Sequence, residues 1–210
     1  MELERQVRAV ALTKPDASDA AKNVTPEKLL KPQRGTPGLH LIVDRGDGTV
    51  VDLGFKLYRE LGRGSKLKAG DIVRLTDDGV RRIDDATKAD LFTYAATLRR
   101  VVDGDTLVVA MEVAPGMWTE LKLRLRGLDC PEMSTPEGKA AKRFVNALVN
   151  DVKSIILRTT KPDKYDRYLA DVFLVTDAGE VYLNNELLAH GQAVRKDAWD
   201  FRDWEKDLPR

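Results

Sequence analysis

Apolar and polar residues alternate in short runs along much of this chain, a pattern that predicts more strands than helices. In the first part, apolar runs flank two turns that contain Asp-Gly, and such a spacing is typical of β-hairpins. The runs are His40 to Val43 with Thr49 to Leu53, and Asp71 to Leu75 with Val80 to Ile83. If Gln6 to Leu12 adds a strand, this region could form a small five-stranded barrel.

A second unit is expected to begin near Ala89. Its strands are predicted at Thr97 to Val102, Thr106 to Ala110, Leu121 to Leu128, Ser154 to Arg158 and Tyr168 to Leu174. Within the third of these, leucines alternate with Lys122, Arg124 and Arg126. Successive side chains of a strand point to opposite faces, so the basic face should turn towards solvent or a site.

Most of the predicted helices lie in the second unit. Thr135 followed by Pro136 favours a helix start, and apolar residues at helical spacing continue to Val149. A short helix is expected from Leu183 to Ala189, ending before Gly191, and a last one over residues 197 to 207. Strands followed by interspersed helices indicate an α+β, mainly β, fold.

The length of 210 residues allows one large domain or two small ones. We expect a β-rich N-terminal region at residues 1–88 and a second domain at 89–210. Proline and small polar residues at 13–37 indicate a loop, with one short helix at Pro26 to Leu30. That loop would precede the strands of the first region.

Charge and cysteine content exclude several classes of protein. The net charge is only +1, so any attraction for a polyanion must be local. Cys130 is the single cysteine, which excludes an internal disulfide. We see neither a signal peptide nor an apolar run of membrane-spanning length, so a cytoplasmic location is expected unless an upstream segment has been removed.

Five charged residues carry the candidate chemistry. They are Asp105, Arg124, Asp129, Glu132 and Arg167. Two carboxylates suit a hard cation, a third suits a general base, and the two guanidinium groups suit a phosphate. Each of these residues is ordinary by itself, but the set describes a metal-assisted phosphodiesterase site.

Several motifs follow one another between about Leu91 and Trp199. They are Asp103-Gly-Asp-Thr, Arg124 with Asp129-Cys-Pro-Glu132, the helix Gly138 to Val149, Asp163-Lys-Tyr-Asp-Arg167 and Asn185 to Gly191. In this order they resemble the staphylococcal nuclease (thermonuclease) family. The resemblance implies an OB-fold five-stranded β-barrel with packed helices. It also implies calcium-dependent hydrolysis of phosphodiester bonds in DNA and RNA, leaving 3′-phosphate ends. Residues 1–90 lie outside the resemblance.

The resemblance also implies roles for individual residues. Asp105, Asp129 and the backbone carbonyl of Cys130 would hold Ca²⁺. Glu132 would act as general base, while Arg124 and Arg167 would bind the phosphate. Lys164 and Tyr165 would contact the phosphate of the nucleotide, and Trp199 would stack on its base.

Some alternatives stay open at this point. Glu137 competes with Glu132, which could be a true base or only orient water, and Arg126 competes with Arg124 as the phosphate ligand. We assign no catalytic histidine. The rival function is a catalytically weak module of the same fold that binds nucleic acid or a protein, but such modules lack the acids or arginines that this chain retains.

The N-terminal region has its own candidate feature, a run of basic residues. These are Lys56, Arg59, Arg63, Lys66 and Lys68. The run favours contact with a polyanion, yet a docking module or a structural cap would also fit this region.

Overall fold

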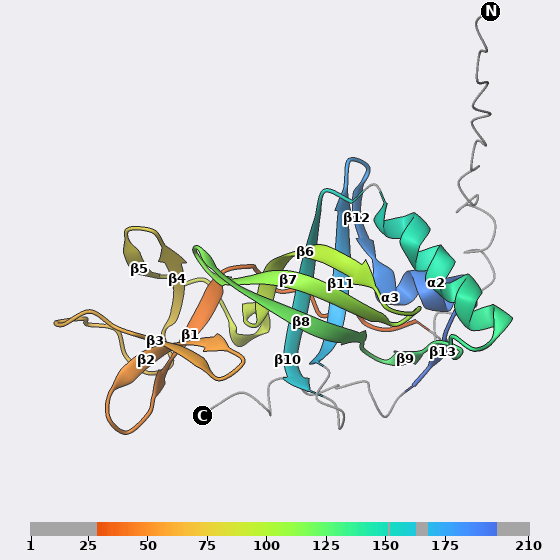
Figure 1. Ribbon diagram of the computed structural model, residues 1–210. Coiled ribbons are helices and arrows are strands. Elements are labelled where there is room, and N and C mark those ends of the chain that lie inside the picture. Colours follow the sequence, from red (N-terminus) through yellow and green to blue (C-terminus); the bar gives the residue numbers. More distant parts are fainter. Residues whose placement is uncertain (1–28, 151, 163–167, 197–210) are drawn as a thin grey trace, which may run out of the picture.

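The computed structural model describes residues 29–150, 152–162 and 168–196 (Figure 1). The predicted strand at Gln6 to Leu12 and the predicted helix at 197–207 lie outside these residues. Two antiparallel-rich sheets follow one another along the described chain, and the helices stand at the end of the second sheet that is remote from the first (Figure 1).

The N-terminal sheet has five antiparallel strands in the order β3-β2-β1-β4-β5. Their bounds are β1 (Leu39–Asp44), β2 (Thr49–Gly54), β3 (Leu57–Glu60), β4 (Ile72–Thr76) and β5 (Gly79–Arg82). Both predicted hairpins are confirmed, with Val43 opposite Val50 and Leu75 opposite Val80. Within the described residues the pairings give an open sheet, and the barrel that would need Gln6 to Leu12 stays a prediction.

The second sheet closes into a barrel, as expected. The barrel strands are β6 (Thr93–Val101), β7 (Thr106–Ala114), β8 (Met117–Leu125), β10 (Ser154–Pro162) and β11 (Tyr168–Thr176). β10 pairs with both β6 and β11, and β11 runs parallel to β8, so the described strands form a closed ring. β12 (Gly179–Tyr182) extends the sheet from β11, while β9 (Leu128–Asp129) pairs with β13 (Val194–Arg195).

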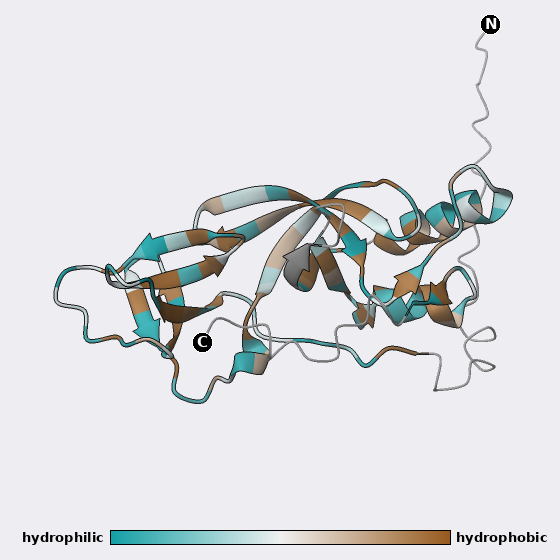
Figure 2. Cartoon of the chain, turned by 90° about the horizontal axis from the view of Figure 1, so that it is seen from below, coloured by the Kyte–Doolittle hydropathy of each residue, from teal (hydrophilic) through white to brown (hydrophobic). Residues whose placement is uncertain are grey.

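Alternating apolar side chains fill the barrel, and Figure 2 shows hydrophobic and hydrophilic segments alternating along its strands. Leu107, Leu123 and Leu157 are fully buried there. This closed, leucine-rich barrel has the OB-fold architecture that the sequence predicted.

Helix α2 (Pro136–Val149) begins where the sequence predicted, because the Thr135 hydroxyl accepts the Gly138 N–H at 3.0 Å. It buries Gly138, Ala141 and Val145 against the barrel. Helix α3 (Leu183–Ala189) also has its predicted bounds, and Gly191 follows it with φ 64°. Neither helix of the described chain has the length and apolar character that crossing a membrane requires.

Residues 29–36 form an extended segment, which we call the strap, that lies along the barrel rather than forming a loop of the N-terminal region. Leu29 and Leu30 are not helical, so the helix predicted at Pro26 to Leu30 does not extend over its described residues. Leu30 is only 3% exposed and packs in the barrel core. The physical reason is that its apolar side chain fills a gap over Gly127, whose missing Cβ leaves room for it.

The strap ends beside the start of the barrel. The N–H of Thr36 donates to the Asp90 carbonyl at 3.0 Å, and the Thr36 hydroxyl donates to the Asp90 carboxylate at 2.8 Å. Asp90 closes a 3-10 turn, Lys88–Asp90, just before β6. The chain therefore leaves the barrel before the N-terminal sheet and returns to it at the same place, so the sheet is an insertion between the strap and β6.

Aromatic residues join the two sheets. The Tyr94 hydroxyl on β6 donates to the Leu53 carbonyl on β2 at 3.0 Å. The Phe55 ring, at the tip of the β2–β3 hairpin, lies 5.4 Å from the Tyr94 ring and 4.8 Å from the Tyr168 ring. These contacts fix the hairpin tip against the barrel at the start of β11.

Candidate active site

Asp105 lies at the turn between β6 and β7 and is only 3% exposed. One carboxylate oxygen accepts the Thr106 hydroxyl at 3.0 Å, and the other accepts the Cys130 N–H at 2.8 Å. Gly104 makes this approach possible, because a Cβ there would come within 2.8 Å of both Cys130 and Ala141. The predicted Asp-Gly-Asp turn is thus docked against the end of β9.

Arg124 joins two carboxylates that come from different turns. Its Nη2 lies 2.9 Å from Asp105 Oδ2 and also donates to Asp129 Oδ1. Arg124 is 8% exposed, and Asp129 follows it at the end of β9. The structure therefore brings together Asp105, Arg124 and Asp129, with both carboxylates directed at one cationic nitrogen.

Burial raises the pKa of Asp105 to about 6, although the Cys130 N–H and the Arg124 charge both favour its ionised form. The pKa of the Cys130 thiol is also raised above its ordinary range, first by burial and then by the charge of Asp105. The raised pKa favours the neutral thiol, and a hard cation prefers oxygen to sulfur, so the Cys130 carbonyl is the group suited to help a calcium site.

The cluster fits a hard cation through its oxygen donors. Asp105 and Asp129 both face the point that the Arg124 nitrogen now occupies, so a positive ion there would stabilise both charged carboxylates. Among the described residues no group of three or more His, Cys, Asp or Glu side chains gathers. A calcium ion would hence need main-chain or water oxygens in addition to these two acids.

Glu132 follows Asp129 by three residues in the sequence, and its side chain is exposed. Its main chain is fixed, because its carbonyl accepts the N–H of Thr135 at 2.9 Å and the hydroxyl of Thr135 at 2.8 Å. A Cβ at Gly138 would come within 2.1 Å of that carbonyl oxygen, so glycine is required in the first helical turn. Among the described residues the Glu132 carboxylate makes no hydrogen bond or ion pair, and its catalytic role stays a prediction.

The sequence prediction missed Lys196. Its Nζ lies 3.6 Å from Asp129 Oδ2, and its N–H donates to the Gly127 carbonyl at 2.8 Å. The pairing of β13 with β9, with Val194 opposite Asp129, brings this lysine to the site from far along the chain. The only signal in the sequence is the basic pair Arg195-Lys196 shortly after Gly191.

A hollow of about 210 Å³ adjoins Asp129, between the end of β9 and the segment before β13. Pro131 lines one side, and Gly191 to Val194 line the other. The hollow is open towards solvent next to the charged cluster, so a group bound to the cluster could extend into it.

The remaining predicted site residues are Lys164, Tyr165, Arg167 and Trp199, and all four lie outside the described residues. Their roles stay predictions. The neighbouring Tyr168 begins β11 and lies opposite Leu123 in the parallel pairing with β8. The strand that carries Arg124 is thus next to the strand that follows Arg167 in the sequence.

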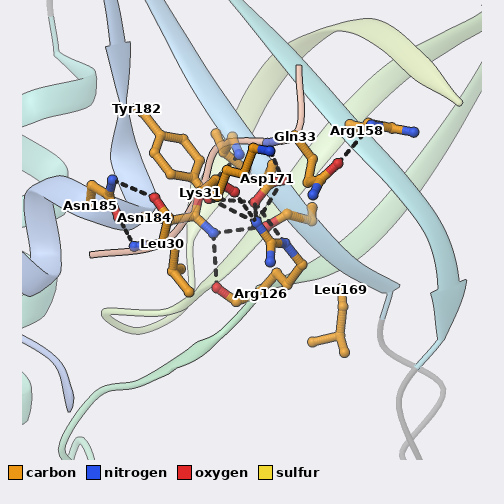
Figure 3. A network of polar contacts seen from close by, with 12 residues as sticks. Leu30, Lys31, Gln33, Arg126, Arg158, Leu169, Asp171, Tyr182, Asn184 and Asn185 are labelled. Atoms are coloured by element: carbon orange, nitrogen blue, oxygen red, sulfur yellow. Dashed lines mark hydrogen bonds and ion pairs between the residues drawn. The ribbon is translucent and has the colours of Figure 1, made fainter. Parts of the chain in front are cut away.

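Arg126 does not face solvent or the site, so that part of the strand prediction is wrong. Its side chain is 1% exposed, and its Nε and Nη2 donate to the two oxygens of Asp171 at 2.9 and 3.0 Å (Figure 3). The reason is that β8 ends at Leu125 and the chain turns at Gly127, with φ 74°. Arg126 is thereby excluded as the phosphate ligand, and Arg124 remains.

The Arg126–Asp171 pair is completed by the strap. Asp171 is fully buried and also accepts the Gln33 N–H at 2.9 Å and the Tyr182 hydroxyl, while Arg126 Nη2 donates to the Lys31 carbonyl at 3.0 Å (Figure 3). Burial raises the pKa of Asp171, and the charge of Arg126 opposes that shift. This network holds the strap on the barrel.

Comparison with known proteins points to one family. Residues 122–208 match the family model described as Staphylococcal nuclease homologue. The chain is 33% identical over 125 residues to the uncharacterized protein MJ1439 of Methanocaldococcus jannaschii, covering 48% of this chain and 58% of that protein. It is also 33% identical over 89 residues to the probable staphylococcal-like nuclease CAN1 of Oryza sativa subsp. japonica, covering 40% of this chain and 25% of the rice protein.

The part of the chain at residues 122–208 therefore belongs to the staphylococcal nuclease family, as the motifs indicated. The chain matches only part of each of these relatives, 58% of the archaeal protein and 25% of the rice protein.

Proposed function

We propose that this protein is a calcium-dependent nuclease that hydrolyses phosphodiester bonds of DNA, RNA or both with little sequence specificity. The observation that supports it most is the convergence of Asp105 and Asp129 on Arg124 at the end of an OB-fold barrel. Such a site would contact the phosphate backbone rather than the base edges, which carry the sequence information.

Each charged residue has a distinct task in this proposal. Arg124 and Arg167 bind the phosphate and stabilise the negative charge that grows on it, because a planar guanidinium meets two phosphate oxygens at once. Glu132 accepts the proton of the attacking water or orients that water. A bound calcium ion, held by Asp105, Asp129 and the Cys130 carbonyl, would polarise the phosphate and help to align the reactants. The bond to the 5′ oxygen breaks and leaves a 3′-phosphate.

Arg124 has to exchange partners when substrate binds. Its Nη2 contacts both carboxylates in the structure, and a cation between them would take over the neutralisation of Asp105 and Asp129. Its guanidinium could then turn towards the phosphate. Lys196 adds a positive charge beside Asp129 and could bind the same phosphate or the next one.

The test is cleavage of single-stranded DNA and of RNA by the full chain, with calcium and with a chelator. We expect calcium-dependent cleavage that Glu132→Gln and Arg167→Ala each reduce by about a hundredfold or more. Glu137→Gln is the matched control, because Glu137 is exposed in the first turn of α2 and should be dispensable.

Two results would contradict the proposal. Cleavage that persists in chelator would show that the reaction does not need calcium. Binding of nucleic acid without any cleavage by the unmodified protein would favour the alternative, a binding module of the same fold.

A further inference from the structure

The β2–β3 hairpin and the loop that follows it carry a local positive charge that the nuclease site does not use. Residues 56–68 hold five basic residues and one acid, in a protein whose net charge is only +1. The basic residues are Lys56, Arg59, Arg63, Lys66 and Lys68. All except the half-buried Arg59 are exposed, so this charge is available to a ligand in solution.

The tip of this hairpin is held in a conformation that side chains other than glycine rarely adopt. Phe55 and Lys56 have φ values of 56° and 62°. Packing of the Phe55 ring against Tyr94 and Tyr168 maintains this conformation and leaves Lys56 exposed. Because Tyr168 begins β11, the basic surface starts beside the strand that follows Arg167 in the sequence.

An exposed aromatic ring lies within the same surface. β3 is an edge strand, and Tyr58 on it is 42% exposed. The Arg45 guanidinium lies 4.2 Å from the centre of the Tyr58 ring. Aromatic rings interspersed with cations are what proteins present to single-stranded nucleic acids, since every unpaired base can stack on a ring.

Two hollows adjoin β3, and Glu60 and Leu61 line both of them. One hollow, of about 940 Å³, is lined by Arg45, Lys56 and Tyr58, and by the acids Asp47 and Glu60. The other, of about 690 Å³, is lined by Arg59, Arg63, Lys66 and Arg82, and by the acids Glu60 and Asp71. Positive groups outnumber acids in the second hollow, and Arg82 there is paired with Asp71 and Asp84.

We propose that the surface formed by Arg45, Lys56, Tyr58, Arg63 and Lys66, the β3 platform, binds a single-stranded segment of nucleic acid. The lysines and arginines contact its phosphates, and Tyr58 stacks with one of its bases. This proposal rests on the proposed function in one respect: the bound segment would belong to the strand that the nuclease site cuts, next to the bond that breaks. A duplex would fit less well, because its bases are already stacked and cannot cover the ring.

The test is the affinity of the full-length protein for a fluorescent single-stranded DNA in chelator, where cleavage is absent, at several salt concentrations. We expect Tyr58→Ala to weaken binding roughly tenfold, as loss of one base–aromatic stack does. The double variant Lys56→Ala/Arg63→Ala should lower the slope of log affinity against log salt by about 1.4, because each lost phosphate contact removes about 0.7 from it.

The matched control is Arg81→Ala/Lys88→Ala, which removes the same charge from exposed positions outside the platform. It should leave the affinity and the salt slope nearly unchanged. Equal weakening by the two double variants would show that binding does not depend on the β3 platform. The same conclusion would follow if neither double variant nor Tyr58→Ala weakened binding. All these positions are exposed, and thermal unfolding will verify that each variant keeps its fold.

Cleavage assays separate this proposal from the nuclease proposal. With a short oligonucleotide that fills only the nuclease site, the platform variants should cleave like the unmodified protein. With a long strand, the KM of Tyr58→Ala should rise roughly tenfold, because the stack between Tyr58 and a base is lost. If the unmodified protein binds through the platform but cleaves nothing, the nuclease proposal fails and the platform stands. If KM changes equally for both lengths, the platform is overturned.

Discussion

Two arginines two residues apart in β8 and its continuation have opposite tasks. Arg124 belongs to the charged cluster, where its partner Asp129 is partly exposed, whereas Arg126 is fully buried beneath the strap with Asp171. An ion pair without solvent contact costs much free energy when one partner is removed, because the other charge is left buried and uncompensated. The stability of the fold should thus depend on Arg126, and catalysis should depend on Arg124.

We expect Arg126→Met to lower the free energy of unfolding by about 3–5 kcal/mol. Arg124→Met should lower it much less, because Asp105 keeps its hydrogen bonds from Cys130 and Thr106 and Asp129 is partly solvated. Urea unfolding of both variants measures this difference. Equal losses would show that the two arginines do not differ in this way.

His40 gives the stability of the protein a pH dependence. Burial lowers its pKa to about 4, and the Arg74 charge acts in the same direction, while a hydrogen bond with the main chain of Asp52 opposes both. An unfolded histidine has a pKa of about 6.5, so the unfolded chain takes up a proton first as the pH falls. His40 therefore makes the folded state less stable as the pH falls from about 6.5 towards about 4.

We expect the unmodified protein to lose about 2 kcal/mol through His40 between pH ~7.5 and pH ~5. His40→Leu should lose less over this range, because the leucine does not titrate. The comparison between the two proteins separates the contribution of His40 from that of Asp52. Burial raises the pKa of Asp52, so Asp52 changes the stability in the opposite sense as the pH falls. Identical pH profiles in urea unfolding would contradict the assignment.

At the scale of elements, the strap acts as part of the barrel. Leu30 exchanges two main-chain hydrogen bonds with the Asn185 side chain on α3, at 2.8 and 3.0 Å. Further along, Arg34 pairs with Glu180 at 3.0 Å and lies 5.6 Å from the Phe173 ring centre. The strap thus ties together α3, β11 and β12.

Leu30→Ala should lower the free energy of unfolding by about 2–5 kcal/mol, because it leaves a cavity in the barrel core. Leu57→Ala is the matched control, since Leu57 is 39% exposed on β3 and should change stability by only about 0.5 kcal/mol or less. Chemical denaturation of the two variants makes the comparison. A small effect of Leu30→Ala would mean that the strap is dispensable.

At the scale of the molecule, the N-terminal sheet is inserted between the strap and the barrel. Its ends meet where Thr36 bonds to Asp90. A division of the chain near residue 88 would consequently separate the barrel from a segment that packs in its core. The sheet itself shares a smaller apolar contact with the barrel, through Ala114 of β7.

We expect a chain that begins at residue 89 to be much less stable than one in which a short glycine linker replaces residues 38–88. Both lack the N-terminal sheet, but only the second keeps Leu30 in the barrel core and the hydrogen bond from Gln33 to Asp171. Calorimetry of the two truncated chains tests this. If their melting temperatures agree, the strap contributes nothing to the barrel.

The local pattern of apolar and polar residues was sufficient to predict most helices and strands. Both helices have their predicted bounds, because Thr135 and Gly191 are local signals that act within one helical turn. The hairpins follow from Asp-Gly turns for the same reason. The strand β3 and the true end of β8 escaped prediction, since a four-residue edge strand has little periodicity and the end of β8 depends on Gly127.

By itself the sequence determined the two helices and the presence of the acids and arginines, because these depend on short-range spacing. The OB-fold barrel followed from the resemblance of motifs in a fixed order to a known family. The tertiary structure decided which arginine belongs to the site, that Lys196 joins it, and that the strap belongs to the barrel. Those outcomes depend on contacts such as Arg126 with Asp171 and Leu30 with Asn185, between residues far apart in the chain. No local pattern encodes such contacts, since they exist only once the barrel has closed.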